Sequence, residues 1–273
     1  MPLDLFSTVN TIIHEADLPR KRAALQELQQ IWQNTPMRTI FFEQQDLSVE
    51  PVGNPSFAAL CCIVHGSQVP RRRNLDTLEG RIIFLHALAH IEYSAIDLAL
   101  DAVYRFRNLP EKFYDDFLNV AFDEMRHFTM LEQLLSELSA HYGFLPVHTG
   151  IHDAMARSQH SLRVRMAATH RHLEANGLDA HPELARKFMT FTDPFAEKVR
   201  AALGIIFEDE INHVRVGDYW FRYACAKEGV STDTFVADVE SAIPGAKFGK
   251  KSLNIDARKR AGFTDRDIAL LEN

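Results

Sequence analysis

Apolar residues recur along most of this chain at intervals of three and four positions, whereas stretches that alternate with a period of two are scarce. Such a pattern is typical of amphipathic α-helices and predicts an all-α protein. Four long segments carry it, at about 75–108, 110–143, 150–176 and 193–229. Because short loops join several of these segments, we expect antiparallel neighbours in a four-helix bundle.

Residues suited to helix ends mark the limits of these segments. Asparagine, aspartate and proline favour the first turn of a helix, and glycine favours the left-handed conformation that ends one. The expected start and stop residues are, in chain order, Asn74 or Asp76, Gly143, Gly177, Asp193 with Pro194, and Gly229.

Shorter elements flank the expected bundle. An amphipathic helix is expected from Leu18 to Gln33, followed by an irregular proline-containing stretch at 35–57. Further short helices are expected at 181–191, 232–243 and 264–273. The expected division is an N-terminal helical segment with an irregular excursion (1–74), the four-helix bundle (75–229) and a C-terminal helical appendage packed on it (230–273).

The second and fourth long segments carry the same polar pattern inside an apolar stripe. The sequences DEMRH, Asp123 to His127, and DEINH, Asp209 to His213, place a glutamate and a histidine three residues apart on one helix face. With 18 Glu and 13 His among 273 residues, chance gives about one E-x-x-H match. Requiring the preceding aspartate lowers that expectation to about 0.06, so the repeat is informative.

Burying ionised carboxylates is very unfavourable unless a cation compensates them, and a metal ion is the strongest candidate. In carboxylate-bridged bundles, two helices give Glu-x-x-His and the other two give one Glu each. The first segment offers Glu92 in a good apolar stripe, and the third offers Glu174 in a poorer one. The predicted ligands are Glu92, Glu124, His127, Glu174, Glu210 and His213, with His170 as a supplementary candidate.

Simpler interpretations of these residues stay open at this point. Each E-x-x-H glutamate faces solvent if the bundle is rotated, and each histidine is a core residue if the aspartate four positions earlier holds it. Those aspartates, Asp123 and Asp209, are alternatively outer partners that orient ligand rings. Glu92 can be an ion-pair partner and Glu174 a surface residue, while Tyr93 is interpreted as a packing residue.

The layout resembles the ferritin-like di-iron carboxylate superfamily. Within it, the stretches HALAHIEYSAIDLALD, FDEMRHF, HLEANGLD and EDEINHV are similar to a bacterial family catalogued as domain of unknown function 455. The resemblance covers roughly Leu78 to Ala224. It implies a ferritin-like bundle with two metal ions held by the six predicted ligands, with iron as the expected metal and manganese as the alternative.

Composition and charge disfavour some classes of binding partner and indicate a cellular compartment. Hydrophobic residues make up 46% of the chain and charged residues 25%, and the formal net charge is -7. Such a charge argues against a general nucleic-acid or membrane-surface binder. Three cysteines give no disulfide framework, no signal peptide is evident, and no segment approaches a membrane span, so we expect a cytoplasmic protein.

The favoured function is a di-iron oxidoreductase of the oxygenase or hydroxylase type, acting on an unidentified small molecule with O2 or peroxide and an electron donor. Alternatives are a ferroxidase or peroxide scavenger, and a non-catalytic metal-binding or partner-binding bundle. A tRNA substrate is conceivable from a superfamily relative but is not favoured by the charge. A homodimer is considered as one oligomeric state.

Overall fold

The computed structural model describes residues 4–35, 48–248 and 252–272. In these ranges the named elements are all helices, and an isolated parallel bridge joins Ile63 and Val147. The all-α class is therefore confirmed. Most of the expected irregular stretch at 35–57 lies outside the described residues.

Internal contacts divide the chain into two compact units, Met1–His152 and Asp153–Asn273. The boundary falls inside α5 (Gly150–Arg157). The three-part division at residues 74 and 229 stays a prediction.

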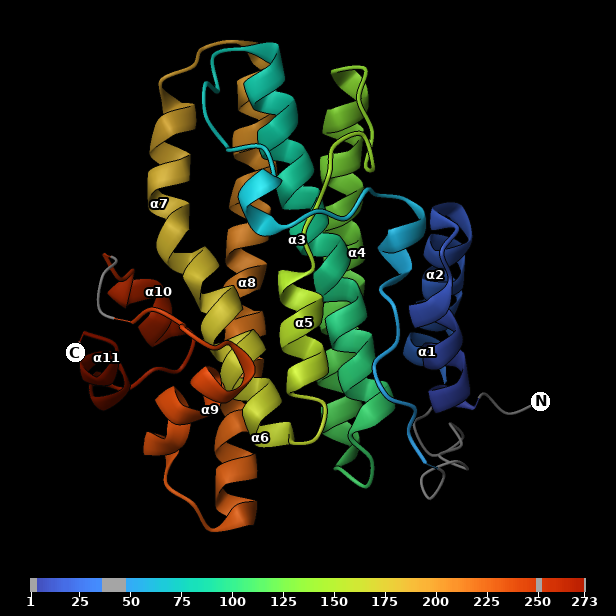
Figure 1. Cartoon of the computed structure of the whole chain (residues 1–273), viewed down its shortest axis with the longest axis vertical. Coiled ribbons are helices and arrows are strands. Elements are labelled where there is room, and N and C mark those ends of the chain that lie inside the picture. Colours follow the sequence, from blue (N-terminus) through green and yellow to red (C-terminus); the bar gives the residue numbers. More distant parts are fainter. Residues whose placement is uncertain (1–3, 36–47, 249–251, 273) are drawn as a thin grey trace. The chain divides into compact units, whose positions relative to one another are not determined.

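The first unit is built on a pair of long helices, α3 (Leu78–Arg105) and α4 (Glu111–Glu137), which run side by side (Figure 1). Thr77, not Asn74 or Asp76, caps α3, because its hydroxyl oxygen accepts a hydrogen bond from the Gly80 amide at 3.0 Å. Asn74 instead adopts a left-handed conformation with φ 54°.

The expected end of α4 at Gly143 is wrong, because the helix ends at Glu137. Ser139 takes the left-handed conformation there, with φ 56°, and the Ala140 amide bonds back to the Leu135 carbonyl at 3.0 Å. Gly143 is also left-handed, but in the following loop. A side chain at Gly143 would meet the Leu60 carbonyl oxygen at 2.5 Å, so the glycine allows a close loop contact.

Two further helices, α1 (Leu5–His14) and α2 (Leu18–Asn34), complete the first unit. The prediction of α2 is confirmed, whereas α1 was not expected. Buried Lys21 joins them to α3, because its ammonium group lies 2.5 Å from Asp97 Oδ1 and 3.1 Å from the Ile12 carbonyl oxygen. Shorter pieces are η2 (Ser56–Ala59) and η3 (Gly66–Gln68).

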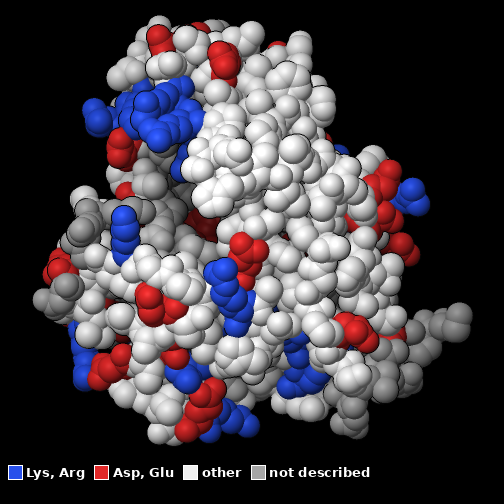
Figure 2. All heavy atoms as spheres, viewed as in Figure 1, with Lys and Arg blue, Asp and Glu red and all other residues white. Residues whose placement is uncertain are grey.

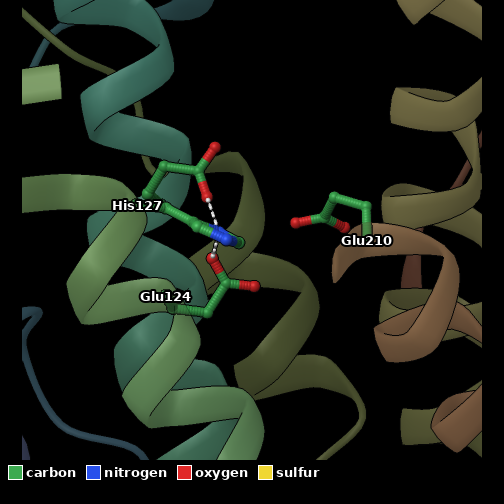
Figure 3. Close-up of side chains that lie close together, drawn as sticks. Glu124, His127 and Glu210 are labelled. Atoms are coloured by element: carbon green, nitrogen blue, oxygen red, sulfur yellow. Dashed lines mark ion pairs between the residues drawn. The ribbon is translucent and has the colours of Figure 1, made fainter. Parts of the chain in front are cut away.

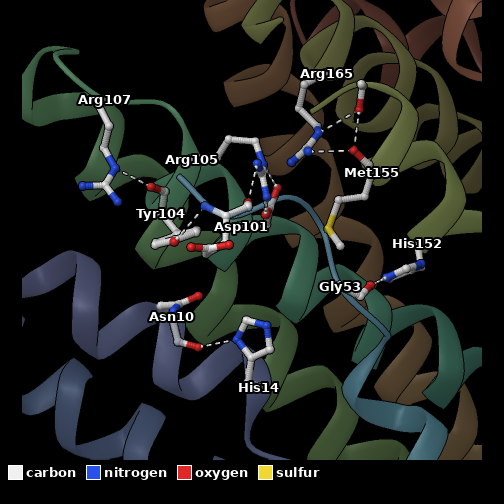
Figure 4. Close-up of polar contacts among 12 residues, drawn as sticks. Asn10, His14, Gly53, Asp101, Tyr104, Arg105, Arg107, His152, Met155 and Arg165 are labelled. Carbon is white, nitrogen blue, oxygen red and sulfur yellow. Dashed lines mark hydrogen bonds and ion pairs between the residues drawn. The ribbon is translucent and has the colours of Figure 1, made fainter. Parts of the chain in front are cut away.

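Local polar contacts fix the ends of these first-unit helices. At the end of α3, the Arg105 guanidinium pairs with Asp101 at 2.7 Å, and Arg107 donates to the Tyr104 carbonyl (Figure 4). The ring of His14 bonds to the Asn10 carbonyl at 2.8 Å in the last turn of α1. These contacts satisfy carbonyl groups and charges that helix ends otherwise leave exposed.

The second unit contains the third predicted helix, which differs most from expectation. A single helix over 150–176 is wrong, because α5 ends at Arg157 and a new helix starts after Ser161, its capping residue. That helix comprises α6 (Leu162–Arg165), a π-helical stretch η4 (Met166–Glu174) and α7 (Ala175–Met189). It passes Gly177 without stopping.

A proline inside α7 shows why the helix continues. Pro182 has no amide hydrogen to give to the Leu178 carbonyl one turn earlier. The side-chain amide of Asn254, far along the chain, donates to that carbonyl at 3.2 Å instead. A contact from the C-terminal region therefore replaces the missing helical bond.

The fourth long helix, α8 (Pro194–Glu228), agrees with the prediction at both ends. The Asp193 carboxylate accepts a hydrogen bond from the Ala196 amide at 3.0 Å, and Pro194 occupies the first helical position. Gly229 ends the helix in the left-handed conformation with φ 69°. These end signals act locally, which is why sequence alone located them.

The C-terminal residues of the second unit form η5 (Thr232–Thr234), α9 (Phe235–Ala242), α10 (Ile255–Arg260) and α11 (Asp265–Glu272). Buried Arg171 of η4 joins α11 to α8, because its guanidinium lies 2.6 Å from Asp218 and 2.5 Å from Asp267. Phe235 and Phe263 pack on the faces of that guanidinium.

By length and composition, α3 would suffice to cross a membrane, contrary to the expectation that no segment approaches this. However, 78% of its most apolar window is buried, as in the core helix of a folded domain.

The face in Figure 2 shows acidic and basic side chains in small separate groups with uncharged surface between them.

Candidate metal-binding residues

The pairing of α3 with α4 brings three predicted ligands together within the first unit. Nδ1 of His127 lies 3.4 Å from Oε2 of Glu92 and 3.4 Å from Oε2 of Glu124 (Figure 3). One ligand atom from each of the three residues lies within 4.8 Å of the other two. Glu124 and His127 share a face because they are three residues apart on α4, and Glu92 reaches them from α3.

These three side chains are buried, with Glu92 4% exposed and both Glu124 and His127 0% exposed. The placement disagrees with a solvent-facing Glu124. The Asp123 carboxylate accepts a hydrogen bond from Arg126 at 2.8 Å. Arg126 is a half-exposed residue of the same helix, so this contact of Asp123 is a surface ion pair.

Burial and mutual contact shift the proton affinity of this group. Burial, then the neighbouring Glu124 carboxylate, raises the pKa of Glu92 to about 8. For His127, burial by itself would lower the pKa, but contacts with Glu124 and Glu92 raise it to about 11. Near neutral pH, Glu92 and His127 therefore both carry a proton, and these protons provide the charge balance that a bound cation would otherwise provide.

The second unit holds the other three predicted ligands, on η4 and α8. Nδ1 of His213 lies 3.6 Å from Oε1 of Glu210, three residues earlier on α8. Glu174 lies at the end of η4, where its Oε1 is 2.7 Å from Nδ1 of His170. Burial would raise the pKa of Glu174, but the adjacent His170 and then His213 lower it overall.

The π-helix explains the poor apolar stripe around Glu174. A π-helix pairs each residue with the fifth along the chain, so its faces differ from those of an α-helix. His170 and Glu174, four residues apart, lie on one side of this helix, as they would in an α-helix, and Nδ1 of His170 is 2.7 Å from Oε1 of Glu174. The sequence clue to the π-helix was the mismatch of the apolar stripe, and π-helical stretches are frequent at functional sites.

Two buried oxygen atoms test whether these residues suit a metal ion. Oε2 of Glu174 accepts no hydrogen bond among the described residues, and Oε2 of Glu92 accepts none of good geometry, since His127 Nδ1 lies 3.4 Å away. Buried carboxylate oxygens normally have a partner, because the desolvation cost is otherwise not repaid. The nearby donor atoms are carboxylate oxygens and imidazole nitrogens without thiolate, a set that suits iron or manganese.

Tyr93 follows Glu92 on α3 and behaves as the packing residue that was predicted. Its buried ring stacks on Tyr142 with centroids 5.2 Å apart, and its hydroxyl lies 3.0 Å from Ser56 Oγ. Its other aromatic neighbours include Phe57 and Phe128.

Comparison with known proteins places this helical chain in a family. The profile of the family described as proteins of unknown function (DUF455) matches residues 14–269, and the chain belongs to that family. It is 37% identical over 213 residues to an uncharacterized protein of Haemophilus influenzae, an alignment that covers 76% of this chain and 72% of the other. No solved structure matches it. The resemblance to this family seen in the sequence is thus confirmed.

Proposed function

We propose that this protein is a dinuclear-metal oxidoreductase whose long helices form a ferritin-like four-helix bundle. In this proposal Glu92, Glu124 and His127 form one half of the metal site, and Glu174, Glu210 and His213 form the other. The observation that carries it is the buried group of Glu92, Glu124 and His127, in which two carboxylates share one imidazole. The repeated D-E-x-x-H pattern and the contact of Glu174 with His170 support a matching second half.

Iron is the favoured metal and manganese the second choice, because the donors are carboxylates and imidazoles. Two ferrous ions with open coordination positions would supply the reduction of dioxygen or peroxide. The protein residues would hold the metal ions: the glutamates supply the negative charge that balances the ions, and the two histidines supply imidazole ligands. The apolar residues around α3 and α4 exclude water from the buried carboxylates.

The substrate class proposed is a small organic molecule, with oxygenation or hydroxylation as the reaction type and an external electron donor. The net charge of -7 disfavours a tRNA substrate, and it gives no attraction to an anionic membrane surface. A cytoplasmic location and a homodimeric state remain predictions from the sequence.

Ferroxidase or peroxide-scavenging activity is the second candidate function. Glu210 favours it, because its side chain is 15% exposed, whereas that of Glu124 is fully buried. A scavenger oxidises added ferrous iron or consumes peroxide without an organic substrate. A non-catalytic binding bundle would instead keep its partner after the metal is removed.

Metal content tests the proposal. The purified full-length protein, loaded with ferrous iron under anaerobic conditions, should contain about two metal ions per chain by elemental analysis. Glu124→Gln and Glu210→Gln should each lower this number by at least half, because each removes a charged ligand while keeping the side-chain size. Glu208→Gln is the matched control, because Glu208 lies on α8 like Glu210 but is exposed and pairs with Arg260 at 2.5 Å.

Full metal content in both ligand variants would overturn the proposed site. Oxygen uptake that depends on an added reductant but needs no organic substrate would favour the ferroxidase or scavenger alternative. Equal loss of metal in Glu208→Gln would show that the effect is not specific to the ligands.

A further inference from the structure

The first unit contains a cavity of about 380 Å³ beside α3, within the range of small-molecule sites. One wall is a face of α3 with Ile83, Ala87 and Ile91, and the others are the segments 66–72, which starts with η3, and 145–151, which ends in the first turn of α5. Ile91 is 40% exposed, so a large apolar side chain of the wall is open to solvent.

This cavity lies on a different face of α3 from the predicted metal ligand Glu92. Successive residues of an α-helix are turned by about 100°. Glu92 is therefore turned by about 100° from Ile91 and by about 140° from Ala87. Glu92 is not among the residues that line the cavity. Binding in this cavity therefore does not depend on the proposed metal site.

Two histidines of α3 hold the opposite wall in place. Nε2 of His86 accepts hydrogen bonds from the Gly143 amide at 3.0 Å and the Leu145 amide at 3.3 Å. The ring of His90 bonds through Nε2 to the His148 carbonyl at 2.8 Å, and through Nδ1 to the Tyr142 hydroxyl at 2.9 Å. Nε2 of His86 accepts from two backbone amides, whereas Nε2 of His90 carries the hydrogen, because the His148 carbonyl oxygen can only accept.

A short backbone pairing supports the same wall. The Val64 amide donates to the Val147 carbonyl, and the Val147 amide donates to the Cys62 carbonyl, each at 2.9 Å. Together with the two histidines, this pairing keeps the loop in one position without help from a ligand. The cavity is therefore preformed, as most small-molecule sites are.

The charge of the cavity comes from arginines. Arg71 and Arg72 are exposed and line it, and no carboxylate is among its lining residues. Within the described part of the chain, neither guanidinium has an ion-pair partner. Arginine binds carboxylate and phosphate groups with two parallel hydrogen bonds. The remaining surface is mainly apolar, with Val69, Pro70 and Leu145 facing the α3 residues.

We propose that this cavity binds a small amphipathic anion, a carboxylate or phosphate monoester attached to an apolar chain. Arg71 and Arg72 bind the anionic head, and the wall of Ile83, Ala87 and Ile91 takes the apolar body. A simple inorganic anion would leave the apolar wall unused, and a neutral alcohol would leave the arginines unused. A metal cation finds no carboxylate here.

Titration calorimetry of the full-length protein with four compounds tests this proposal. Decanoate and decyl phosphate carry both features, decanol lacks the charge and inorganic phosphate lacks the chain. We expect the two amphipathic anions to bind at least tenfold more tightly than decanol or phosphate. A stronger response to decyl phosphate than to decanoate assigns the head as phosphate, and the reverse assigns it as carboxylate.

Variants locate the binding. Arg71→Gln combined with Arg72→Gln should weaken anion binding at least tenfold. Arg73→Gln is the matched control, because Arg73 is the next residue but does not line the cavity, and it should change affinity less than threefold. Ile91→Trp should block the apolar wall, and its exposed position makes folding of this variant secure.

Several results would overturn the proposal. They are decanol binding as tightly as the anions, inorganic phosphate binding as tightly as decyl phosphate, or affinity unchanged in both the arginine pair variant and Ile91→Trp. Absence of measurable binding by all four compounds would also overturn it. Unchanged far-UV circular dichroism in each variant shows that a loss of affinity does not come from a loss of helical structure.

Discussion

Gly217 of α8 lies directly against His170 of the π-helical stretch: a Cβ atom added at Gly217 would be 2.3 Å from the Cβ of His170. The glycine therefore sets how closely α8 approaches the segment that carries Glu174. Backbone proximity at this point brings His170, Glu174 and His213 into electrostatic contact. A small residue in α8 is thus a positioning element for half of the candidate metal site.

Gly217→Ala should destabilise the protein, although alanine normally favours a helix. The added methyl group forces a shift of the His170 backbone, and we expect a loss of about 1–3 kcal/mol in the free energy of unfolding. Urea denaturation measures this change. Gly204→Ala is the control, because Gly204 lies in the same helix with nothing within 4 Å, and it should gain about 0.5–1 kcal/mol. Equal effects of both substitutions would contradict the close approach.

Metal binding should release protons. Burial and the Glu124 carboxylate raise the pKa of Glu92 to about 8, and contacts with Glu124 and Glu92, acting against burial, raise that of His127 to about 11. Both groups are therefore largely protonated at neutral pH, and each must lose its proton to bind a metal. Binding of Mn²⁺ should release between about one and two protons and tighten as the pH rises toward 8.

Calorimetric titration with Mn²⁺ in buffers of different ionisation enthalpy counts these protons. Glu92→Gln should release about one proton fewer than the unmodified protein, because its amide does not titrate. Binding enthalpies that are independent of the buffer would show that Glu92 and His127 release no protons when the metal binds.

The loop after α4 should make the protein sensitive to acid. Burial, then the neighbouring His90, lowers the pKa of His86 to about 4 from an ordinary value of 6.5. Below pH 6.5 the unfolded chain takes up a proton that the folded chain does not, so the stability present above pH 6.5 is lost as the pH falls toward 4. The loss from His86 is at most about 3 kcal/mol.

Denaturation measured at intervals from pH 7 to pH 4 tests this dependence. In His86→Gln the amide oxygen can still accept hydrogen bonds from Gly143 and Leu145 but does not titrate. We expect a shallower decline for that variant, with the remainder due to other groups that include His90, whose pKa is likewise about 4. Identical slopes for the two proteins would exclude His86 as a contributor.

The side chain of Asn254 should matter chiefly because Pro182 is present. Asn254→Ser keeps a residue able to cap α10 but no longer reaches the Leu178 carbonyl, and we expect a loss of about 1 kcal/mol. In Pro182→Ala the alanine amide bonds to that carbonyl, so the same substitution should cost less. A double-mutant cycle by urea denaturation measures the coupling, and strict additivity would refute it.

Much of the helical framework was predictable from local signals. The limits of α8 follow from Asp193, Pro194 and Gly229, which act on their own backbone neighbours, and α2 follows from its apolar spacing. The end of α4 was missed because Ser139, without an evident glycine signal, adopts the left-handed conformation. The all-α class depended on many such signals, so single errors did not change it.

The candidate site divides in the same way. Glu124 with His127, and Glu210 with His213, were paired by helical periodicity, and in both cases the two side chains lie together. The contact between His170 and Glu174 also agrees with a four-residue helical spacing, whereas the π-helix that carries both residues was not predicted, because no spacing rule for α-helices detects it. Arg71, Arg72 and the histidines of the cavity follow no motif in the sequence, because only the packing of distant segments makes them a site.

Sequence alone determined the helical class, the family and the repeated Glu and His pairs, since these depend on composition and on intervals of three and four residues. Tertiary structure decided where α4 stops, why α7 continues through Pro182, and how the cavity beside α3 is walled. The physical reason is that these features depend on contacts such as Asn254 with Leu178 and Gly143 with His86. Such contacts join residues far apart in the chain, and no local pattern encodes them.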